Sequence, residues 1–223
     1  MQRTNLKLML MTVMLLAGCQ GVPWAQPISL ASPEADRVKA ALANWPKVAK
    51  DDVLRRPFFL TLHVAGLRTT ASGILEYHGP RDFRVTAATE MGAILFDGRV
   101  NWAGATVLRH MPGVDTGAIE AMLRDMVRAF DLPTDLDGLK AGDSKLEISR
   151  ELADTHRYTW IFNRADGRLL QTQVDLGLLD VLRINYEGYS TRGWPKELQV
   201  TRRARLYDVS FTFTDDSVAE TGK

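Results

Sequence analysis

The feature that most constrains the fold is the number of short segments in which apolar and polar residues alternate. Apolar residues take every second position at residues 58–64, and strict alternation returns at residues 182–187 and 207–213. A period of two residues is typical of a strand with one apolar face and one polar face. Turn signals such as Gly79-Pro80 separate these segments. Tight turns favour antiparallel neighbours, because parallel strands need crossovers of a dozen residues or more.

The pattern predicts about eleven strands in one antiparallel sheet. Their expected ranges are residues 58–64, 70–77, 83–87, 93–96, 100–108, 146–151, 157–163, 169–175, 181–189, 197–203 and 206–214. A turn at Asp97-Gly98 is expected to separate the fourth strand from the fifth. These assignments leave little of the chain for helices.

Two segments have a helical period instead. Ser32 suits an N-cap and Pro33 the first helical position, and apolar residues recur at helical spacing until Pro46. A second helix is expected to start after Asp115-Thr116 and to end at Pro133, with apolar residues at helical spacing over residues 119–130. Two helices are too few to cover eleven strands laid flat. We therefore predict an α+β fold in which a curved antiparallel half-barrel of about eleven strands wraps around two main helices and can leave an apolar hollow.

The N-terminal segment predicts export from the cytoplasm. Cys19, the one cysteine among 223 residues, follows a short basic region and an apolar stretch at residues 8–17. This length indicates a secretory signal peptide, because a membrane-spanning helix needs roughly twenty apolar residues. Residues 16–19, Leu-Ala-Gly-Cys, resemble the bacterial lipobox, in which the cysteine is lipidated after cleavage. A general secretory signal that ends near a cysteine is the alternative.

The resemblance to the lipobox also implies a location. In lipoproteins of Gram-negative bacteria an Asp after the lipidated cysteine favours the inner membrane, and here Gln20 follows Cys19. The implied location is the periplasmic face of the outer membrane, with Cys19 as the lipid anchor. We expect a lipoprotein signal peptide at residues 1–18, a lipidated tether at 19–31, a single domain at 32–216 and a C-terminal tail at 217–223.

Charge and motif content exclude several functions. There are 28 Lys and Arg against 27 Asp and Glu, so the basic excess typical of nucleic-acid binding is missing. The four histidines lie on separate predicted strands or strand ends without metal-ligand spacing, and no Gly-x-Ser-x-Gly elbow or phosphate-binding glycine loop occurs. We predict no nucleic-acid partner, no metal, no cofactor, no catalytic residue and therefore no enzyme. A hydrolase of envelope glycolipid is the alternative, and it would need a titratable pair that converges in the cavity.

Several short runs together resemble one family. The first group is Gly73-Ile74-Leu75-Glu76-Tyr77, Pro80, Phe83-Arg84 and Asp97-Gly98-Arg99-Val100-Asn101-Trp102. The second group is Ile184-Asn185-Tyr186, Tyr189 and Trp194-Pro195-Lys196-Glu197-Leu198. With the order of helix, strands, helical insertion and further strands behind a lipobox, the sequence resembles the LolA/LolB-like family of periplasmic lipoprotein carriers and outer-membrane lipoprotein receptors.

This resemblance implies a function and its partners. The implied protein is an outer-membrane-anchored lipoprotein that binds acyl chains or lipidated cargo in an apolar cavity, in lipoprotein or lipid transport. The expected partners are the outer membrane, an acyl chain, lipid or lipoprotein cargo, and a periplasmic carrier as a further candidate. The alternative is a structural or assembly lipoprotein with a self-filled core. Lipoproteins of this architecture also accompany pathways for lipid-linked pigments of the aryl polyene type.

Two sets of residues are candidates for contact with lipid. The apolar ligand is expected to contact inward residues of the central strands and of the second helix, namely Leu60, Leu62, Leu75, Phe83, Val85, Trp102, Met122, Met126, Trp160, Phe162, Ile184 and Phe211. These residues fit a self-packed core equally well. In the receptor branch of the family a loop carries an exposed apolar side chain that engages membrane or cargo. Met91, beside Gly92, is expected to take this role, and a buried Met91 is the alternative.

Overall fold

The computed structural model describes residues 25–45, 48, 52–64, 67–152, 154–191, 193–202, 204, 207–214 and 220–221. The predicted signal peptide, Cys19 and the first part of the predicted tether lie outside the described residues. Most of the predicted C-terminal tail also lies outside them.

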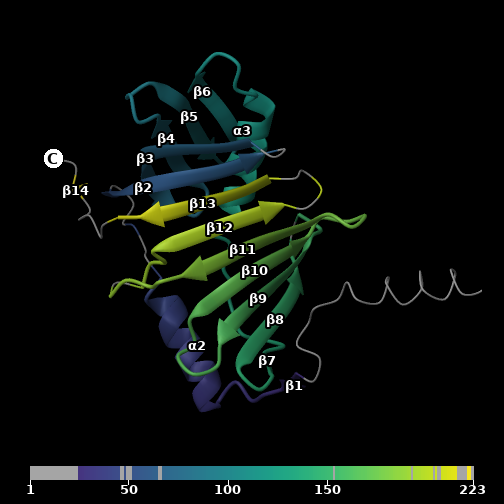
Figure 1. The fold of residues 1–223 in the computed structure, drawn as a ribbon. Helices are drawn as coiled ribbons and strands as arrows, with labels where there is room; N and C mark the ends of the chain where they lie inside the picture. The colour runs from purple at the N-terminus through teal and green to yellow at the C-terminus, as the bar shows by residue number, and fades with distance from the viewer. Residues whose placement is uncertain are drawn as a thin grey trace, which may run out of the picture.

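The described residues form one antiparallel sheet with eleven strands of six or more residues. These strands are β2 (Asp52–Val64), β3 (Leu67–Gly79), β4 (Asp82–Ala88), β5 (Ile94–Asn101), β6 (Gly104–His110), β8 (Lys145–Glu151), β9 (Arg157–Asn163), β10 (Leu169–Asp175), β11 (Val181–Glu187), β12 (Glu197–Arg202) and β13 (Tyr207–Phe213). Their order is β8-β9-β10-β11-β12-β13-β2-β3-β4-β5-β6, so the last long strand pairs with the first. Figure 1 shows this sheet as one curved, open layer. The predicted fold class is confirmed.

Three two-residue strands attach the ends of the described chain to this sheet. β1 (Gln26–Pro27) pairs with β7 (Lys140–Ala141), which in turn pairs with β8, and β14 (Glu220–Thr221) pairs with β2. The last part of the predicted tether is therefore docked on the sheet. The sequence did not indicate this pairing, because Pro27 reads as a strand breaker and is tolerated here at the edge of the sheet.

The two described helices begin where the sequence predicts. In α2 (Pro33–Ala43) the Ser32 hydroxyl accepts from the Ala35 N–H, and in α3 (Thr116–Val127) the Asp115 carboxylate accepts from the Gly117 N–H at 2.9 Å. α3 ends at Val127, before the predicted end at Pro133. There the backbone tightens into i→i+3 hydrogen bonds that keep Phe130 buried. Among the described residues, no helix combines the length and the apolar content that crossing a bilayer requires.

The predicted turn at Asp97-Gly98 is wrong, because both residues lie inside β5. Asp97 is 1% exposed and accepts hydrogen bonds from Arg84 on β4 at 2.8 and 2.7 Å. A Cβ on Gly98 would lie 2.4 Å from Cδ1 of Leu123, so this glycine lets α3 approach the sheet closely. A cross-strand ion pair and a helix contact therefore explain the two residues that the sequence presents as a turn signal.

Both helices contribute to one core on the concave face of the sheet. The Tyr186 hydroxyl on β11 donates to the carbonyl of Ala129 at 2.9 Å, and the Tyr186 ring lies 5.8 Å from Trp45, just after α2. The indole of Trp160 on β9 donates to the carbonyl of Asp131 at 2.9 Å. α3 thus packs against β5 and β6, while the segment after it lies against the inner side of β9 and β11. The buried side chains of this face form one continuous apolar cluster.

Candidate functional site

A pocket of about 470 Å³ lies beside the C-terminal half of α3, where several turns of the sheet meet the helix. Its walls come from α3, from the β5–β6 turn at residues 101–104, from the β8–β9 turn and from Leu176 after β10. We call it the mouth pocket. Its charged or titratable residues other than Tyr are Arg81, Arg124, Asp125, Arg128, Asp131, Asp154, His156 and Arg202.

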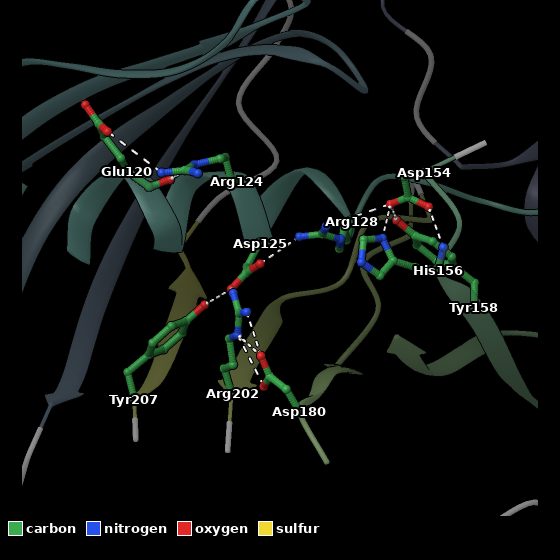
Figure 2. Close-up of polar contacts among 10 residues, drawn as sticks. All are labelled: Glu120, Arg124, Asp125, Arg128, Asp154, His156, Tyr158, Asp180, Arg202 and Tyr207. Carbon is green, nitrogen blue, oxygen red and sulfur yellow. Dashed lines mark hydrogen bonds and ion pairs between the residues drawn. The ribbon is translucent and has the colours of Figure 1, made fainter. Parts of the chain in front are cut away.

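Asp125 is the central carboxylate of the mouth pocket and is 1% exposed. It accepts a hydrogen bond from Arg128 at 2.7 Å, one from Arg202 on β12 at 2.8 Å, and one from the hydroxyl of Tyr207 on β13. Figure 2 shows these three donors converging on one side chain. We call these four residues the Asp125 network. The network ties α3 to two strands that are distant in sequence.

Two further carboxylates extend the Asp125 network toward the turns. Arg202 donates to Asp180 at 2.6 Å, and Arg128 lies 3.8 Å from Asp154 (Figure 2). Burial lowers the pKa of Arg202, but its hydrogen bonds to Asp180 and Asp125 outweigh burial and place the pKa above its ordinary value. Arg202 is thus charged across the ordinary pH range.

Asp154 and His156 form the β8–β9 side of the mouth pocket. Nδ1 of His156 lies 3.0 Å from Asp154, which also accepts from the Tyr158 hydroxyl at 3.0 Å. Burial raises the pKa of Asp154, but the hydrogen bonds from His156 and Tyr158 outweigh it, so the pKa lies below its ordinary value. Asp154 therefore stays ionised near neutral pH and supports the positive charge of Arg128.

The pKa of Asp131, in the same pocket, is shifted in the opposite direction to that of Asp154. Burial raises the pKa of Asp131, although Arg81, 3.3 Å away, opposes this effect. The guanidinium of Arg81 also lies 5.7 Å from the centre of the Trp102 ring. The predicted inward position of Trp102 is wrong, because this residue is in the β5–β6 turn and is 83% exposed. The strand before it ends at Asn101, so its side chain is not part of the alternating pattern.

The other predicted ligand-lining residues lie together in the core. Ten of them are at most 3% exposed and belong to the continuous apolar cluster, while Leu62 is partly buried against it. These ten are Leu60, Leu75, Phe83, Val85, Met122, Met126, Trp160, Phe162, Ile184 and Phe211. Of the twelve predicted residues, Trp102 alone lines the mouth pocket. The others belong to the continuous apolar cluster or pack against it.

Met91 lies in the loop between β4 and β5 and is 94% exposed. Gly92 has a φ of +79°, a conformation that glycine adopts without cost, and the loop is closed by a hydrogen bond from the Thr89 N–H to the Ala93 carbonyl. The strand therefore does not continue through Met91. Contact of Met91 with membrane or cargo stays a prediction.

Sequence reasoning missed the charged residues of the mouth pocket. The available signal was Asp125, a carboxylate between Arg124 and Arg128 at the border of the apolar stripe of α3. Its partners Arg202 and Tyr207 are 77 and 82 residues away in the chain, so no local pattern connects them. Among the described residues, no group of three or more His, Cys, Asp or Glu side chains has a geometry that could hold a metal ion.

Comparison with solved structures identifies the fold. The chain resembles a LolA superfamily protein from Nitrosomonas europaea with a TM-score of 0.52 and 11% sequence identity, over 83% of this chain and 93% of that chain. An outer membrane lipoprotein-sorting protein domain from Vibrio parahaemolyticus matches with a TM-score of 0.42 and 11% identity, over 84% and 92% of the two chains. A DUF1329 family protein from Desulfovibrio piger matches with a TM-score of 0.43 and 10% identity, over 83% and 92%.

No family model and no curated protein matches the sequence. The likeness to the Nitrosomonas protein shows that the chain has the fold of the LolA superfamily. The resemblance inferred from the sequence motifs is therefore confirmed at the level of the fold.

Proposed function

We propose that the protein is a lipoprotein, anchored through Cys19 at the periplasmic face of the outer membrane, that binds acyl chains or lipid-modified cargo beneath α3 without catalysing a reaction. One observation carries the proposal. α3 packs against β5 and β6 of an open half-barrel with its buried side in the continuous apolar core, and its C-terminal half is fastened to β12 and β13 by the polar Asp125 network. The fold of the LolA superfamily supports the same class of function.

The buried side of α3 suits a ligand with a flexible chain. Ile119, Met122, Leu123 and Met126 are at most 5% exposed on this side. An unbranched thioether adapts to irregular apolar surfaces, so the two methionines can pack against sheet residues in one state and against an acyl chain in another. A displaced α3 would provide one wall of the site, and the sheet would provide the other.

The fastening of α3 is of a kind that can open locally. Arg128 and Arg202 keep 18% and 14% of their side-chain surface exposed, so water can replace their contacts when the helix moves. Local opening has its lowest free-energy cost where few apolar contacts must break. The end of α3 at the mouth pocket is therefore the expected entry point for an acyl chain.

The test is a titration of the full-length protein with cis-parinaric acid, a fluorescent fatty acid. Arg128→Ala removes a link of the Asp125 network and should lower the apparent Kd by about threefold or more, because apparent affinity follows the population of the binding-competent state. The matched control is Glu120→Ala on the same helix, outside the mouth pocket, where the partly exposed side chain lies 3.8 Å from Arg124; its Kd should equal that of the unmodified protein. Absence of saturable binding in all three proteins would refute the proposed function.

A second function is favoured by a different observation. The ten predicted ligand-lining residues of the core are at most 3% exposed, so the apolar interior is filled by its own side chains. This supports a structural or assembly lipoprotein that holds no lipid. Such a protein could serve a pathway for lipid-linked pigments of the aryl polyene type. Native mass spectrometry of the purified protein separates the two functions, because a lipid-binding protein retains acyl-chain adducts and a self-filled one does not.

The anchoring has its own test. Cys19→Ala should yield a protein that is soluble or uncleaved, because the residue that would carry the acyl chains is missing. Fractionation of the cell envelope measures this directly. Recovery of the variant in the outer membrane, in the same amount as the unmodified protein, would contradict the assignment of Cys19 as the anchor.

A further inference from the structure

The turn between β10 and β11 has an unusual conformation for its sequence. The Asp180 N–H donates to the Gly177 carbonyl at 2.8 Å and closes a four-residue turn with Leu178 and Leu179 at its centre. Their φ angles are +40° and +69°. Positive φ at both central positions is the signature of a type I′ hairpin turn, for which Asn and Gly are the favoured residues.

Leucine is unfavourable at both positions. A branched side chain in the left-handed region is strained, and such strain persists mainly where function requires it. The two side chains are also 104% and 85% exposed, so no packing within the protein offsets the strain. Two adjacent leucines at a turn tip, both strained and both fully in solvent, point to a contact outside the chain.

The position of this turn connects it to the mouth pocket. Leu176, two residues before the tip, lines the pocket from one side, and Trp102 lines it from the β5–β6 turn. The carboxylate of Asp180 is paired with Arg202 at 2.6 Å, so it presents little net charge beside the tip. Figure 1 shows the β10–β11 hairpin projecting at the right-hand side of the sheet, beyond the neighbouring ends of β12 and β13.

The composition around the pocket fits a lipid bilayer better than a protein partner. An exposed Trp with a guanidinium near its ring, as in Trp102 and Arg81, is typical of the boundary between acyl chains and headgroups. Two leucine side chains at a narrow tip offer far less than the roughly 800 Å² per partner of a stable protein interface. A fluid bilayer needs no complementary shape, so a narrow tip can enter it.

We infer that the Leu178–Leu179 turn inserts into the acyl layer of the membrane that carries the protein and thereby turns the mouth pocket toward that membrane. The contact is too small to hold the protein by itself. It rests on the lipid anchor of the proposed function, which keeps the domain at a high effective concentration beside the bilayer. The turn then fixes orientation, while the anchor supplies attachment.

The experiment places a fluorophore at the tip. The full-length lipidated protein is reconstituted in vesicles of phosphatidylethanolamine and phosphatidylglycerol, and Leu178→Cys is labelled with the dye NBD; a lipidated Cys19 has no free thiol. Ala165→Cys, at the exposed β9–β10 turn on the opposite end of β10, is the matched control. We expect lipids spin-labelled in the acyl chain to quench position 178 at least threefold more strongly than position 165. Equal quenching of the two positions would overturn the inference.

A second variant separates membrane contact from a structural role. Leu178→Asn with Leu179→Gly supplies the residues that a type I′ turn prefers, so Tm should rise by a few degrees. Quenching of an NBD label at Trp102→Cys should fall at least threefold in this background. A fall in Tm would mean that the leucines pack within the protein, and unchanged quenching would mean that they do not orient it; either result overturns the inference. Binding of cis-parinaric acid should be unchanged, so that a failure of the proposed function is recognised separately.

Discussion

The two sides of α3 that contact the rest of the domain differ in chemistry. Over the concave face, Met122 and Met126 meet aromatic and aliphatic side chains that are almost completely buried. At the mouth pocket, Asp125 of the same helix accepts hydrogen bonds from two arginines and a tyrosine hydroxyl beside a space of about 470 Å³. One helix therefore has an apolar contact and a polar contact with the same sheet.

The difference suggests how stability and movement are divided. Apolar burial is non-directional and tolerates sliding or repacking, whereas an ion pair depends on a fixed geometry and is lost when one partner moves. The apolar contact therefore sets the global stability of the domain, and the Asp125 network sets the position of α3. Substitutions in the two regions should have different consequences.

The largest expected effect comes from the apolar region. Trp160 is 0% exposed and stacks on Tyr158 with ring centroids 5.6 Å apart, so Trp160→Ala should lower the free energy of unfolding by about 3–5 kcal/mol. Trp102→Ala is the matched control, because Trp102 is 83% exposed and its loss should change stability by less than about 0.5 kcal/mol. Urea denaturation of both variants measures the difference. Equal destabilisation would mean that burial does not separate the two regions.

An intermediate effect on the free energy of unfolding is expected from the Asp125 network. Asp125→Ala leaves Arg128 and Arg202 without their shared carboxylate. The loss should be about 2 kcal/mol, below the roughly 3–5 kcal/mol of a fully buried pair, because both arginines keep some contact with water. Glu120→Ala on the same helix serves as the control and should change the free energy of unfolding by less than about 0.5 kcal/mol.

The same substitution tests whether the Asp125 network controls the local motion of α3. Asp125→Ala should increase amide exchange in α3 more than in β9 or β11, since the network positions the helix and not the sheet. A uniform increase across the whole domain would mean that Asp125 contributes only to global stability. In that case the division between the two regions would be wrong.

The smallest expected effect is a pH dependence within the mouth pocket. The pKa of Asp131 is raised by burial above its reference value of 3.8, so the folded state favours its protonated form. The stability that this group contributes is fully present below the unfolded pKa and is lost as the pH rises through the folded pKa. Asp131→Asn should therefore gain stability relative to the unmodified protein as the pH rises from about 4 to 7. Thermal unfolding over this range measures the gain, and a relative loss would contradict the assignment.

The strands and the class of fold could be predicted from the sequence because their signals are local. Alternation at residues 207–213 and caps such as Ser32 and Asp115 act over a few residues, and the structure has each element there. The predicted turn at Asp97-Gly98 was wrong because an Asp-Gly pair can form a turn in one protein and, as here, an ion pair and a helix contact inside a strand. The partners of Asp97, Arg84 and Arg109, become neighbours only through the pairing of β5 with β4 and β6.

The candidate site was largely beyond such local signals. Most of the predicted apolar residues do face inward, but alternation does not tell whether an inward side chain meets a ligand or another side chain. Leu178 and Leu179 are read as ordinary apolar residues, because leucine carries no turn propensity and their positive φ angles arise from the hairpin geometry. The Asp125 network could not be predicted, because Arg202 on β12 and Tyr207 on β13 meet Asp125 only in the folded structure.

The proposed function requires α3 to open from the sheet without unfolding of the domain. Native-state hydrogen exchange of the full-length protein, read separately for residues 116–127 and for β9 to β11, measures this opening. We expect the amides of α3 to exchange at least tenfold faster than those of the three strands, and saturating cis-parinaric acid to change the exchange rate of α3 while leaving the strands unaffected. If α3 exchanges as slowly as β9 to β11, with and without the fatty acid, the helix opens only by global unfolding and cannot admit an acyl chain.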